Sequence, residues 1–330
     1  LLTLGIAPVI VARVFFVWVS VFSLFAVAVF WSFMADLFTA EQGKRLFGFI
    51  GAGGTAGGLL GPVITIGLSV PLGPVNLLIA AAVLLELAVF CVSRLERAAA
   101  NRAGAPMEPR VGGSAFAAVP ELVRSPYLIG VGIWVSLLSF CATIVYFEQA
   151  NIVSANVHGA GAQTRIFASI DLAVGLLSLA TQVFATGQVL KRFGTGIAAA
   201  ALPGVYVIGF AALFAAPTLA VVVTLQVVQR WMNFAIANPA RQVFFTVLDR
   251  EEKYKAKNLI DVVIYRGSDA LYGWVFDSLQ ALGLKLGAIA LCMVPVAAGW
   301  LVVSAALGRA QERRAAIGEV SAAALQGERA

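Results

Sequence analysis

Long apolar runs separated by short charged connections dominate the chain. A helix needs about 20 apolar residues to cross the ~30 Å hydrocarbon layer of a membrane. About nine segments meet this requirement, and they cover residues 14–36, 46–70, 75–93, 126–147, 166–190, 197–216, 218–240, 258–282 and 286–308. Residues 1–12 are apolar but too short to cross, so we interpret them as the end of an earlier helix. The pattern predicts an all-α polytopic membrane bundle and not a barrel, whose strands would alternate over ~10 residues.

Composition supports this prediction. The chain is 60% hydrophobic and 12% charged, whereas soluble domains have about 45–50% apolar and about 25% charged residues. A water-soluble domain and a disordered chain are therefore excluded. Cys91, Cys141 and Cys292 all lie inside apolar runs without metal-ligand spacing, and His158 is the one histidine. We therefore expect no metal site and no cofactor.

The basic residues lie mostly on one side of the predicted membrane. Eighteen of the 23 Lys and Arg residues fall in the loops reached after the first full span or in the C-terminal tail. The opposite side holds Arg13, Arg165 and Lys285. The positive-inside rule therefore places the C-terminal tail in the cytoplasm and the observed N-terminus outside. We expect a multi-pass protein of the bacterial inner membrane.

The longest hydrophilic connection, residues 94–125, is predicted to be a flexible cytoplasmic linker because it contains Pro and a Gly-Gly-Ser stretch. It separates residues 1–93, part of an N-terminal half-bundle, from a six-helix half-bundle over 126–308, and a cytoplasmic tail covers 309–330. Three full spans precede the linker. If three more helices came before them, the design would be six helices, a linker and six helices, which is the major-facilitator arrangement.

Two stretches resemble a known family. They are Phe30-Trp-Ser-Phe-Met-Ala-Asp-Leu-Phe with the following Glu41-Gln-Gly-Lys-Arg, and Asn238-Pro-Ala-Arg-Gln-Val-Phe-Phe with Glu251-Glu-Lys-Tyr-Lys-Ala-Lys. Both are similar to the bacterial and plastid ATP/ADP carrier (nucleotide translocase) branch of the major facilitator superfamily. The resemblance implies a transporter, and nucleotide exchange is one activity it allows.

Charged side chains inside spans are candidates for function, since each costs ~2.5–3.5 kcal/mol at the bilayer centre. Gln226, Arg230 and Asn233 recur at i, i+4 and i+7 in the seventh span, so they share one helix face. Arg266 and Asp269 lie at a similar depth in the eighth span. We expect these five residues to bind an anionic substrate. The alternative is an ion pair of Arg230 with Asp269 or Glu86 that only positions helices.

Other residues are candidates for coupling and gating. Glu86 and Asp171 lie within apolar spans and could bind and release a proton, as coupling in a symporter would need. Asp36, Lys44, Arg45, Lys255 and Lys257 lie in charged loops that could close one side of the bundle. The alternative for these loop residues is a topology signal with lipid-headgroup contacts. Gly53, Gly57 and Gly61, spaced four apart in one span, predict close helix packing.

The leading hypothesis is a secondary transporter that works by alternating access on an anionic solute such as a nucleotide or phosphorylated metabolite. A proton-coupled carrier of another small solute is the runner-up, and a non-transporting membrane sensor is the rival from another class. An enzyme is not expected, because no catalytic cluster is visible. The expected partners are the small solute and membrane lipid, with no nucleic acid, and the expected state is a monomer. A polar cavity lined by Arg230, Asn233 and Asp269 would favour a transporter, whereas a sealed Arg230 would favour a sensor.

Overall fold

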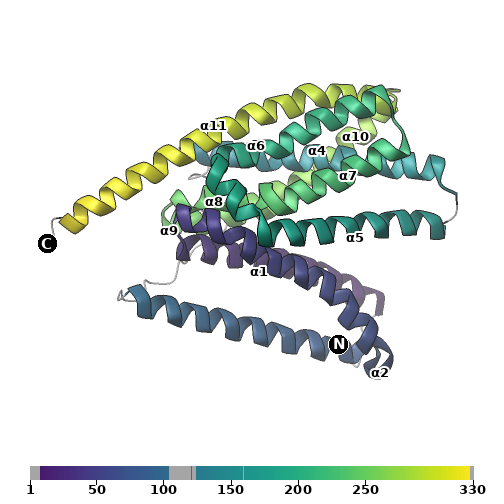
Figure 1. Ribbon diagram of the computed structural model, residues 1–330. Coiled ribbons are helices and arrows are strands. Elements are labelled where there is room, and N and C mark those ends of the chain that lie inside the picture. Colours follow the sequence, from purple (N-terminus) through teal and green to yellow (C-terminus); the bar gives the residue numbers. More distant parts are fainter. Residues whose placement is uncertain (1–7, 104–119, 121–123, 159, 328–330) are drawn as a thin grey trace.

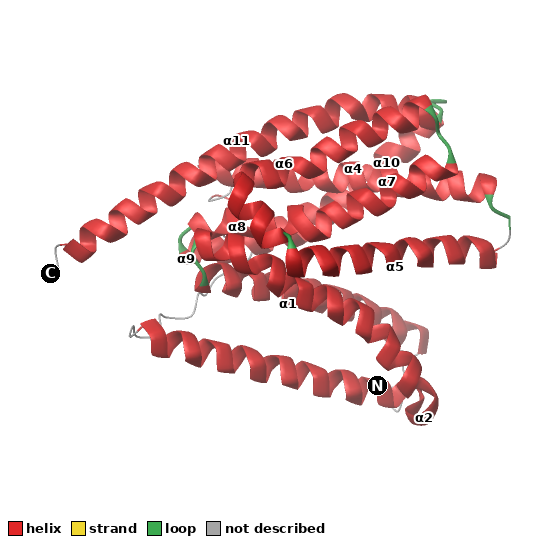
Figure 2. Ribbon diagram, in the orientation of Figure 1, coloured by secondary structure: helices red, strands yellow, loops and turns green. Residues whose placement is uncertain are grey.

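The computed structural model describes residues 8–103, 120, 124–158 and 160–327, and helices make up nearly all of this part of the chain (Figures 1 and 2). The elements in order are α1 (Pro8–Leu37), α2 (Ala40–Ala103), α4 (Pro126–Asn156), α5 (Ala160–Phe184), α6 (Thr186–Ala215), α7 (Leu219–Met232), the π-helix η3 (Asn233–Ala237), α8 (Asn238–Phe244), the 3-10 helix η4 (Phe245–Val247), α9 (Arg250–Asn258), the π-helix η5 (Leu259–Ile264), α10 (Tyr265–Ala281) and α11 (Leu286–Gly327).

Four of the described helical stretches are long and apolar enough to cross a membrane: Pro126–Asn156, Thr186–Ala215, Leu219–Val247 and Leu286–Ile317. Val21–Leu37 and Ser169–Phe184 are shorter apolar helices. The chain is therefore a polytopic helical membrane protein, as the apolar runs predicted.

The break between α1 and α2 has a local cause. The Thr39 backbone N–H donates to Gln42 Oε1 (3.1 Å), and the Gln42 N–H donates to Thr39 Oγ1 (3.4 Å). This reciprocal capping box satisfies two N–H groups that lack partners at a helix start. The charged segment from Thr39 therefore begins a new helix, at the junction that the hydropathy pattern predicted.

Helix α2 contains both of the predicted spans 46–70 and 75–93, and it continues into the predicted linker as far as Ala103. Pro71 and Pro74 lie in its interior, where proline removes a helical hydrogen bond and bends the axis. Its later part turns back and runs beneath the rest of the bundle (Figure 1). Residues 94–103 are thus helical, and most of the remaining linker lies outside the described residues.

The core of the bundle is built around aromatic side chains where α4, α6 and α11 meet. Trp134, Tyr206 and Trp300 are fully buried, and the Trp134 and Trp300 rings contact edge to face with centroids 5.4 Å apart. The Trp134 indole N–H donates to Ser304 Oγ (2.9 Å), which satisfies its polar atom inside an apolar core.

Helices α6 and α11 lie side by side along the bundle (Figure 1) and cross at two glycines. A Cβ added to Gly196 would meet the Gly308 Cα at 2.9 Å, so only glycine fits on both sides. Two residues earlier, Gly194 has φ 80°, and α6 is kinked there. Beyond the crossing α11 leaves the bundle (Figure 1), and the described part of the predicted 309–330 tail continues this helix to Gly327.

Candidate functional site

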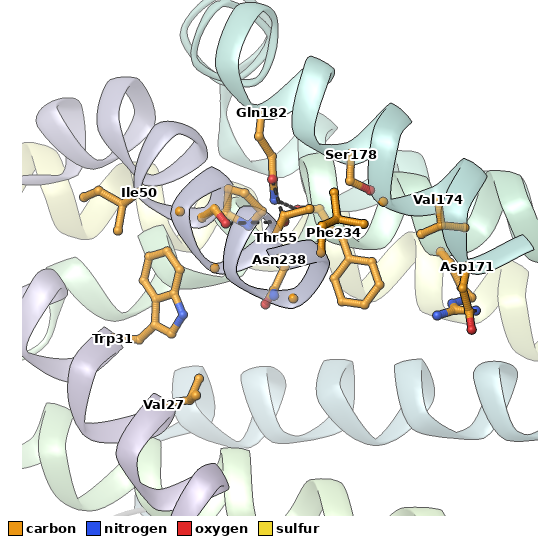
Figure 3. Close-up of a pocket in the computed structure, with 18 of the residues that line it drawn as sticks. Val27, Trp31, Ile50, Thr55, Asp171, Val174, Ser178, Gln182, Phe234 and Asn238 are labelled. Carbon is orange, nitrogen blue, oxygen red and sulfur yellow. Dashed lines mark hydrogen bonds and ion pairs between the residues drawn. The ribbon is translucent and has the colours of Figure 1, made fainter. Parts of the chain in front are cut away.

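A cavity of about 1020 Å³ lies between α1, α2, α5 and the segment from α7 through η3 to α8 (Figure 3). Three aromatic residues contribute to its wall: Phe30, Trp31 and Phe234. Its polar lining consists of Thr55, Asp171, Ser178, Gln182, Arg230 and Asn238. The cavity therefore combines aromatic surface with a few polar groups and one cation, a composition typical of small-molecule sites.

Arg230 is the cation of this cavity, and it is paired with an acid. Its Nη1 lies 2.5 Å from Asp171 Oδ1, joining α7 to α5. The Arg230 side chain is 37% exposed, and the Asp171 side chain is more open still. The partner is thus Asp171 and neither Asp269 nor Glu86, the two acids that the sequence suggested for such a pair. Both groups line the cavity.

One face of α5 supplies much of the polar wall. Asp171, Gly175, Ser178 and Gln182 all line the cavity, and they are spaced at i, i+4, i+7 and i+11. This spacing is a helical stripe. Of these residues the sequence analysis singled out Asp171 alone, although the same periodicity was visible in the fifth apolar span.

The wall formed by α7 depends on a change of helix type. Arg230, Phe234 and Asn238 line the cavity at intervals of four residues. The π-helix η3 begins at Asn233 and ends just before Asn238, and a π-helical turn shifts the register of the residues that follow it. Asn233, predicted to bind substrate on the face of Arg230, is half-buried and outside the described lining, where Asn238 contributes an amide instead.

Two side chains from neighbouring helices stabilise η3. Pro239 has no N–H, so the Ala235 carbonyl loses its usual helical donor, and Thr186 Oγ1 donates to this carbonyl at 2.7 Å. Gln182 Nε2 donates to the Phe234 carbonyl at 2.9 Å. The irregular segment beside Arg230 is therefore held by α5 and α6.

Gln182 also reaches across the cavity wall to α2. Its Oε1 accepts a hydrogen bond from Thr55 Oγ1 at 2.7 Å, and the two side chains point toward each other in Figure 3. Gln182 is almost fully buried, so both of its polar atoms need these partners. One amide thus connects a helix of the N-terminal region to the segment that carries Arg230.

Gln226, the third member of the predicted polar face on α7, lies in the interior of the bundle. It donates through Nε2 to Gln149 Oε1 of α4 and accepts from Gln229 Nε2 (2.5 Å). Gln229 in turn accepts from the Tyr206 hydroxyl (2.7 Å). This buried chain of hydrogen bonds joins α4, α6 and α7, and Gln226 is outside the described lining of the cavity.

Arg266 and Asp269 form a separate polar group where α10 packs on α4. Arg266 Nη1 lies 3.4 Å from Asp269 Oδ2 one turn away, and Ser139 Oγ donates to Asp269 Oδ1 at 2.5 Å. The Arg266 side chain is exposed, and neither residue is in the described lining of the Arg230 cavity. Glu86 lies elsewhere, on the later part of α2, where the described side chains from residue 81 to 92 are exposed.

A second group of charges connects α1 to α9 at one end of the bundle. Lys253 Nζ lies 3.3 Å from Asp36 Oδ1 and donates to the Ala35 carbonyl at 3.0 Å. Of the other predicted gating residues, Lys44 pairs with Glu41 one turn away (2.7 Å) on α2. Arg45 is exposed on α2, and Lys255 is half-buried on α9.

Lys257, also predicted to act in gating, is fully buried beside this connection. Its Nζ lies 3.1 Å from Asp261 Oδ2, donates to Gln242 Oε1 and sits 4.1 Å from the centre of the Phe245 ring. Arg241 approaches the same carboxylate at 3.4 Å. Lys257 lies outside the four long apolar stretches. Burial lowers its pKa from the ordinary 10.5 to about 8, and the Asp261 carboxylate opposes this effect.

The glycines of α2 have a role that differs from the predicted one. A Cβ added at Gly53, Gly57 or Gly61 would meet no heavy atom of the described residues within 4 Å. Gly53 is part of the cavity wall, and the cavity is wider there because glycine has no side chain. Close helix contact occurs instead at Gly48, whose added Cβ would lie 2.5 Å from the Thr186 Cβ.

Comparison with known proteins agrees with the resemblance seen in the sequence. No family model matches the chain. It is 26% identical to ADP,ATP carrier protein 2 of Chlamydia pneumoniae over 225 residues, which are 59% of this chain and 41% of that protein. It is 25% identical to ADP,ATP carrier protein 2 of Chlamydia trachomatis over 217 residues, with 57% and 39% of the two chains covered. The chain spans about two fifths of the length of these curated relatives. It is therefore a distant homologue of the chlamydial ADP,ATP carrier proteins.

Proposed function

We propose that the protein is a secondary active transporter that binds an anionic solute, a nucleotide or another phosphorylated metabolite, in the Arg230 cavity. The observation that carries this proposal is the half-open guanidinium of Arg230 inside a cavity of about 1020 Å³. A guanidinium offers forked donors that match phosphate and carboxylate oxygens. The names of the chlamydial relatives support a nucleotide as the first solute to test.

In this proposal Asp171 holds the site in the absence of solute. Its carboxylate occupies one of the donors that a phosphate would need. An incoming anion displaces Asp171, and the aromatic rings of Trp31 and Phe234 offer apolar surface for an organic moiety such as a base. The same displacement would release Asp171, one of the two sequence-predicted candidates for proton coupling, to bind a proton.

Transport would follow alternating access, in which two half-bundles rock around the cavity. We propose that α1 and α2 belong to an N-terminal half, that α4 to α11 form the second half, and that all nine predicted spans cross the membrane. The α8–α9 end would face the cytoplasm of a bacterial inner membrane, as the basic residues favour. There the Asp36–Lys253 contact and the Lys257 cluster would close the cytoplasmic side.

A proton-coupled carrier of another small solute, using Asp171 or Glu86, is the second candidate. It is favoured by the position of Asp171, whose carboxylate faces the cavity and contacts the cation there. The exposure of Arg230 argues against a sensor, for which a sealed side chain was expected. In the proposed transporter of anions, Arg266 and Asp269 would serve as a second anion-binding group on α10.

The experiment is uptake by the intact protein in proteoliposomes, with labelled ATP compared with other anions, in the presence and absence of a pH gradient. We expect ATP or a related phosphate compound to accumulate, and Arg230→Ala to abolish the accumulation. Arg192→Ala is the matched control, since Arg192 lies exposed on α6 outside the described cavity lining. Unchanged uptake by Arg230→Ala would disprove the proposed role of Arg230, and accumulation of uncharged solutes alone would disprove the anionic substrate.

A further inference from the structure

Glu148 is a buried acid that the proposed cavity does not use. It lies on α4 inside a long apolar stretch, and it is 1% exposed. Its Oε1 has no hydrogen-bond partner among the described residues. The fourth predicted span ends at residue 147, one residue before this acid, whereas the helix continues to Asn156.

The residues one turn before and after Glu148 on its face of α4, Ile144, Val145 and Ile152, are all buried core residues. The preceding residue, Phe147, stacks on Phe276 of α10 with ring centroids 5.0 Å apart. The following residue, Gln149, accepts a hydrogen bond from Gln226 of α7. These neighbours are mostly apolar, with one amide from α7.

The elements that pack against α4 are α7, η5, α10 and α11, and each carries charged or titratable groups. On α7 there is Arg230, and on η5 there is Asp261. The described groups on α10, on α11 and just before α11 are Tyr265, Arg266, Asp269, Tyr272, Asp277, Lys285, Cys292, Arg309, Glu312, Arg313 and Arg314. Asp277 is the one beside Phe276, and it is exposed. Within the described part of the chain, Glu148 makes no ion pair or hydrogen bond with any of these groups.

An ionised carboxylate in such surroundings would be very costly, and a buried acid without a cation normally becomes neutral by binding a proton. We propose that Glu148 is a proton-binding site of the transporter, occupied in this conformation and emptied in another. This proposal rests on the proposed function. It adds a site that lies apart from the Arg230–Asp171 pair.

The buried amide chain links this site to the anion site. Gln149 contacts Gln226, and Arg230 lies one turn further along the same helix. A negative charge on Glu148 would destabilise the packing of α4 against α7 that this structure shows. Release of the proton therefore favours a different arrangement of the helix that carries Arg230, and this connects proton occupancy to anion binding.

Infrared difference spectroscopy on the purified intact protein tests the proton site without any transported solute. A change from mildly acidic to alkaline pH should remove a protonated-carboxyl C=O band in the wild type. Glu148→Gln should lack this band, Glu148→Asp should shift it, and Asp277→Asn, which removes an exposed carboxyl near the same level, should keep it. A band that is unchanged in both Glu148 variants, or no titrating band in the wild type, would overturn the proposal.

ATP uptake in proteoliposomes separates this proposal from the function on which it rests. If the wild type transports ATP, Glu148→Gln should reduce at least tenfold the response of uptake to a pH gradient, while Asp277→Asn keeps the full response. A full response in Glu148→Gln would overturn coupling through Glu148. Failure of the wild type to transport any anion would overturn the proposed function, and the infrared bands would still report whether Glu148 binds a proton.

Discussion

Lys253 Nζ on α9 lies 3.3 Å from Asp36 Oδ1 on α1, and the two residues are separated by 217 positions in the chain. Lys253 is almost fully buried, and it also donates to the Ala35 carbonyl at 3.0 Å. The contact therefore fixes the first described helix to the C-terminal bundle at the end where α8 and α9 lie (Figure 1).

This contact should contribute measurably to stability. A double-mutant cycle with Asp36→Asn and Lys253→Met should give a coupling free energy of about 0.5–3 kcal/mol, the range for residues that share an ion pair. Thermal unfolding of the purified variants in detergent is the measurement. The matched control is Glu41 with Lys44, a pair one turn apart on α2 in which the Glu41 side chain is exposed. Side-chain pairs at this helical spacing contribute only about 0.2–0.5 kcal/mol. Equal coupling in the two cycles would contradict the assignment.

The buried ammonium of Lys257 predicts an unusual pH dependence. Its pKa is lowered to about 8 by burial, whereas the unfolded chain keeps the ordinary 10.5. Between these two values the unfolded state binds more protons, so the free energy of unfolding should rise with pH across this window. The unfolding temperature of the wild type, measured relative to Lys257→Met, should therefore increase from pH 8 to pH 10.5.

A second variant tests the cause of this shift. Asp261 accepts the ion pair from Lys257 at 3.1 Å and raises its pKa. Asp261→Asn should therefore lower the pKa of Lys257 further and extend the window of rising stability below pH 8. A flat stability difference between wild type and Lys257→Met over the whole range would show that Lys257 is not buried in this way.

The crossing of α6 and α11 should tolerate no side chain at Gly308. A Cβ there would collide with the Gly196 backbone, and overpacking of a tight contact costs about 1–3 kcal/mol. We expect Gly308→Ala to lower the unfolding temperature. Gly299→Ala on the same helix is the control, since an added Cβ there meets nothing within 4 Å and alanine favours a helix by about 1 kcal/mol over glycine. Destabilisation by both variants alike would exclude the crossing as the cause.

Two buried threonines of α6 should respond in opposite ways to replacement by valine. Thr186 donates to the Ala235 carbonyl in η3, and loss of this donor leaves a buried acceptor unsatisfied at a cost of about 1–3 kcal/mol. Thr195 is equally buried, but its Oγ1 has no partner among the described residues. Thr186→Val should therefore destabilise the protein and weaken binding at Arg230, whereas Thr195→Val should be neutral or stabilising. Thermal unfolding of both variants is the measurement, and the reverse order would be incompatible with a supported π-helix.

The sequence predicted the helical membrane class and singled out Arg230, which lines the cavity. Composition and apolar run length suffice to predict the helical membrane class, because few soluble interiors need such long apolar segments. The position of Arg230 inside a span suffices to single it out, because the free-energy cost of a charged side chain in lipid requires a polar environment around it. The spacing of Asp171, Ser178 and Gln182 carried the same information and was missed.

The partner of Arg230 could not be derived from depth alone. The sequence offered Asp269 and Glu86 as partners of Arg230, but pairing also depends on which way each helix faces and on its bends. The later part of helix α2 turns back (Figure 1), and the π-turn at Asn233 changes the face of α7 that reaches the cavity. Neither bend follows from hydropathy.

The most direct test of the central claim is equilibrium binding of labelled ATP to the purified intact protein. Arg230 should supply the anion-binding charge and Asp171 should compete for it, since the two lie 2.5 Å apart in the cavity. We therefore predict that Arg230→Ala loses binding at least tenfold, whereas Asp171→Asn binds ATP more tightly than the wild type. Wild-type affinity in Arg230→Ala would contradict the account.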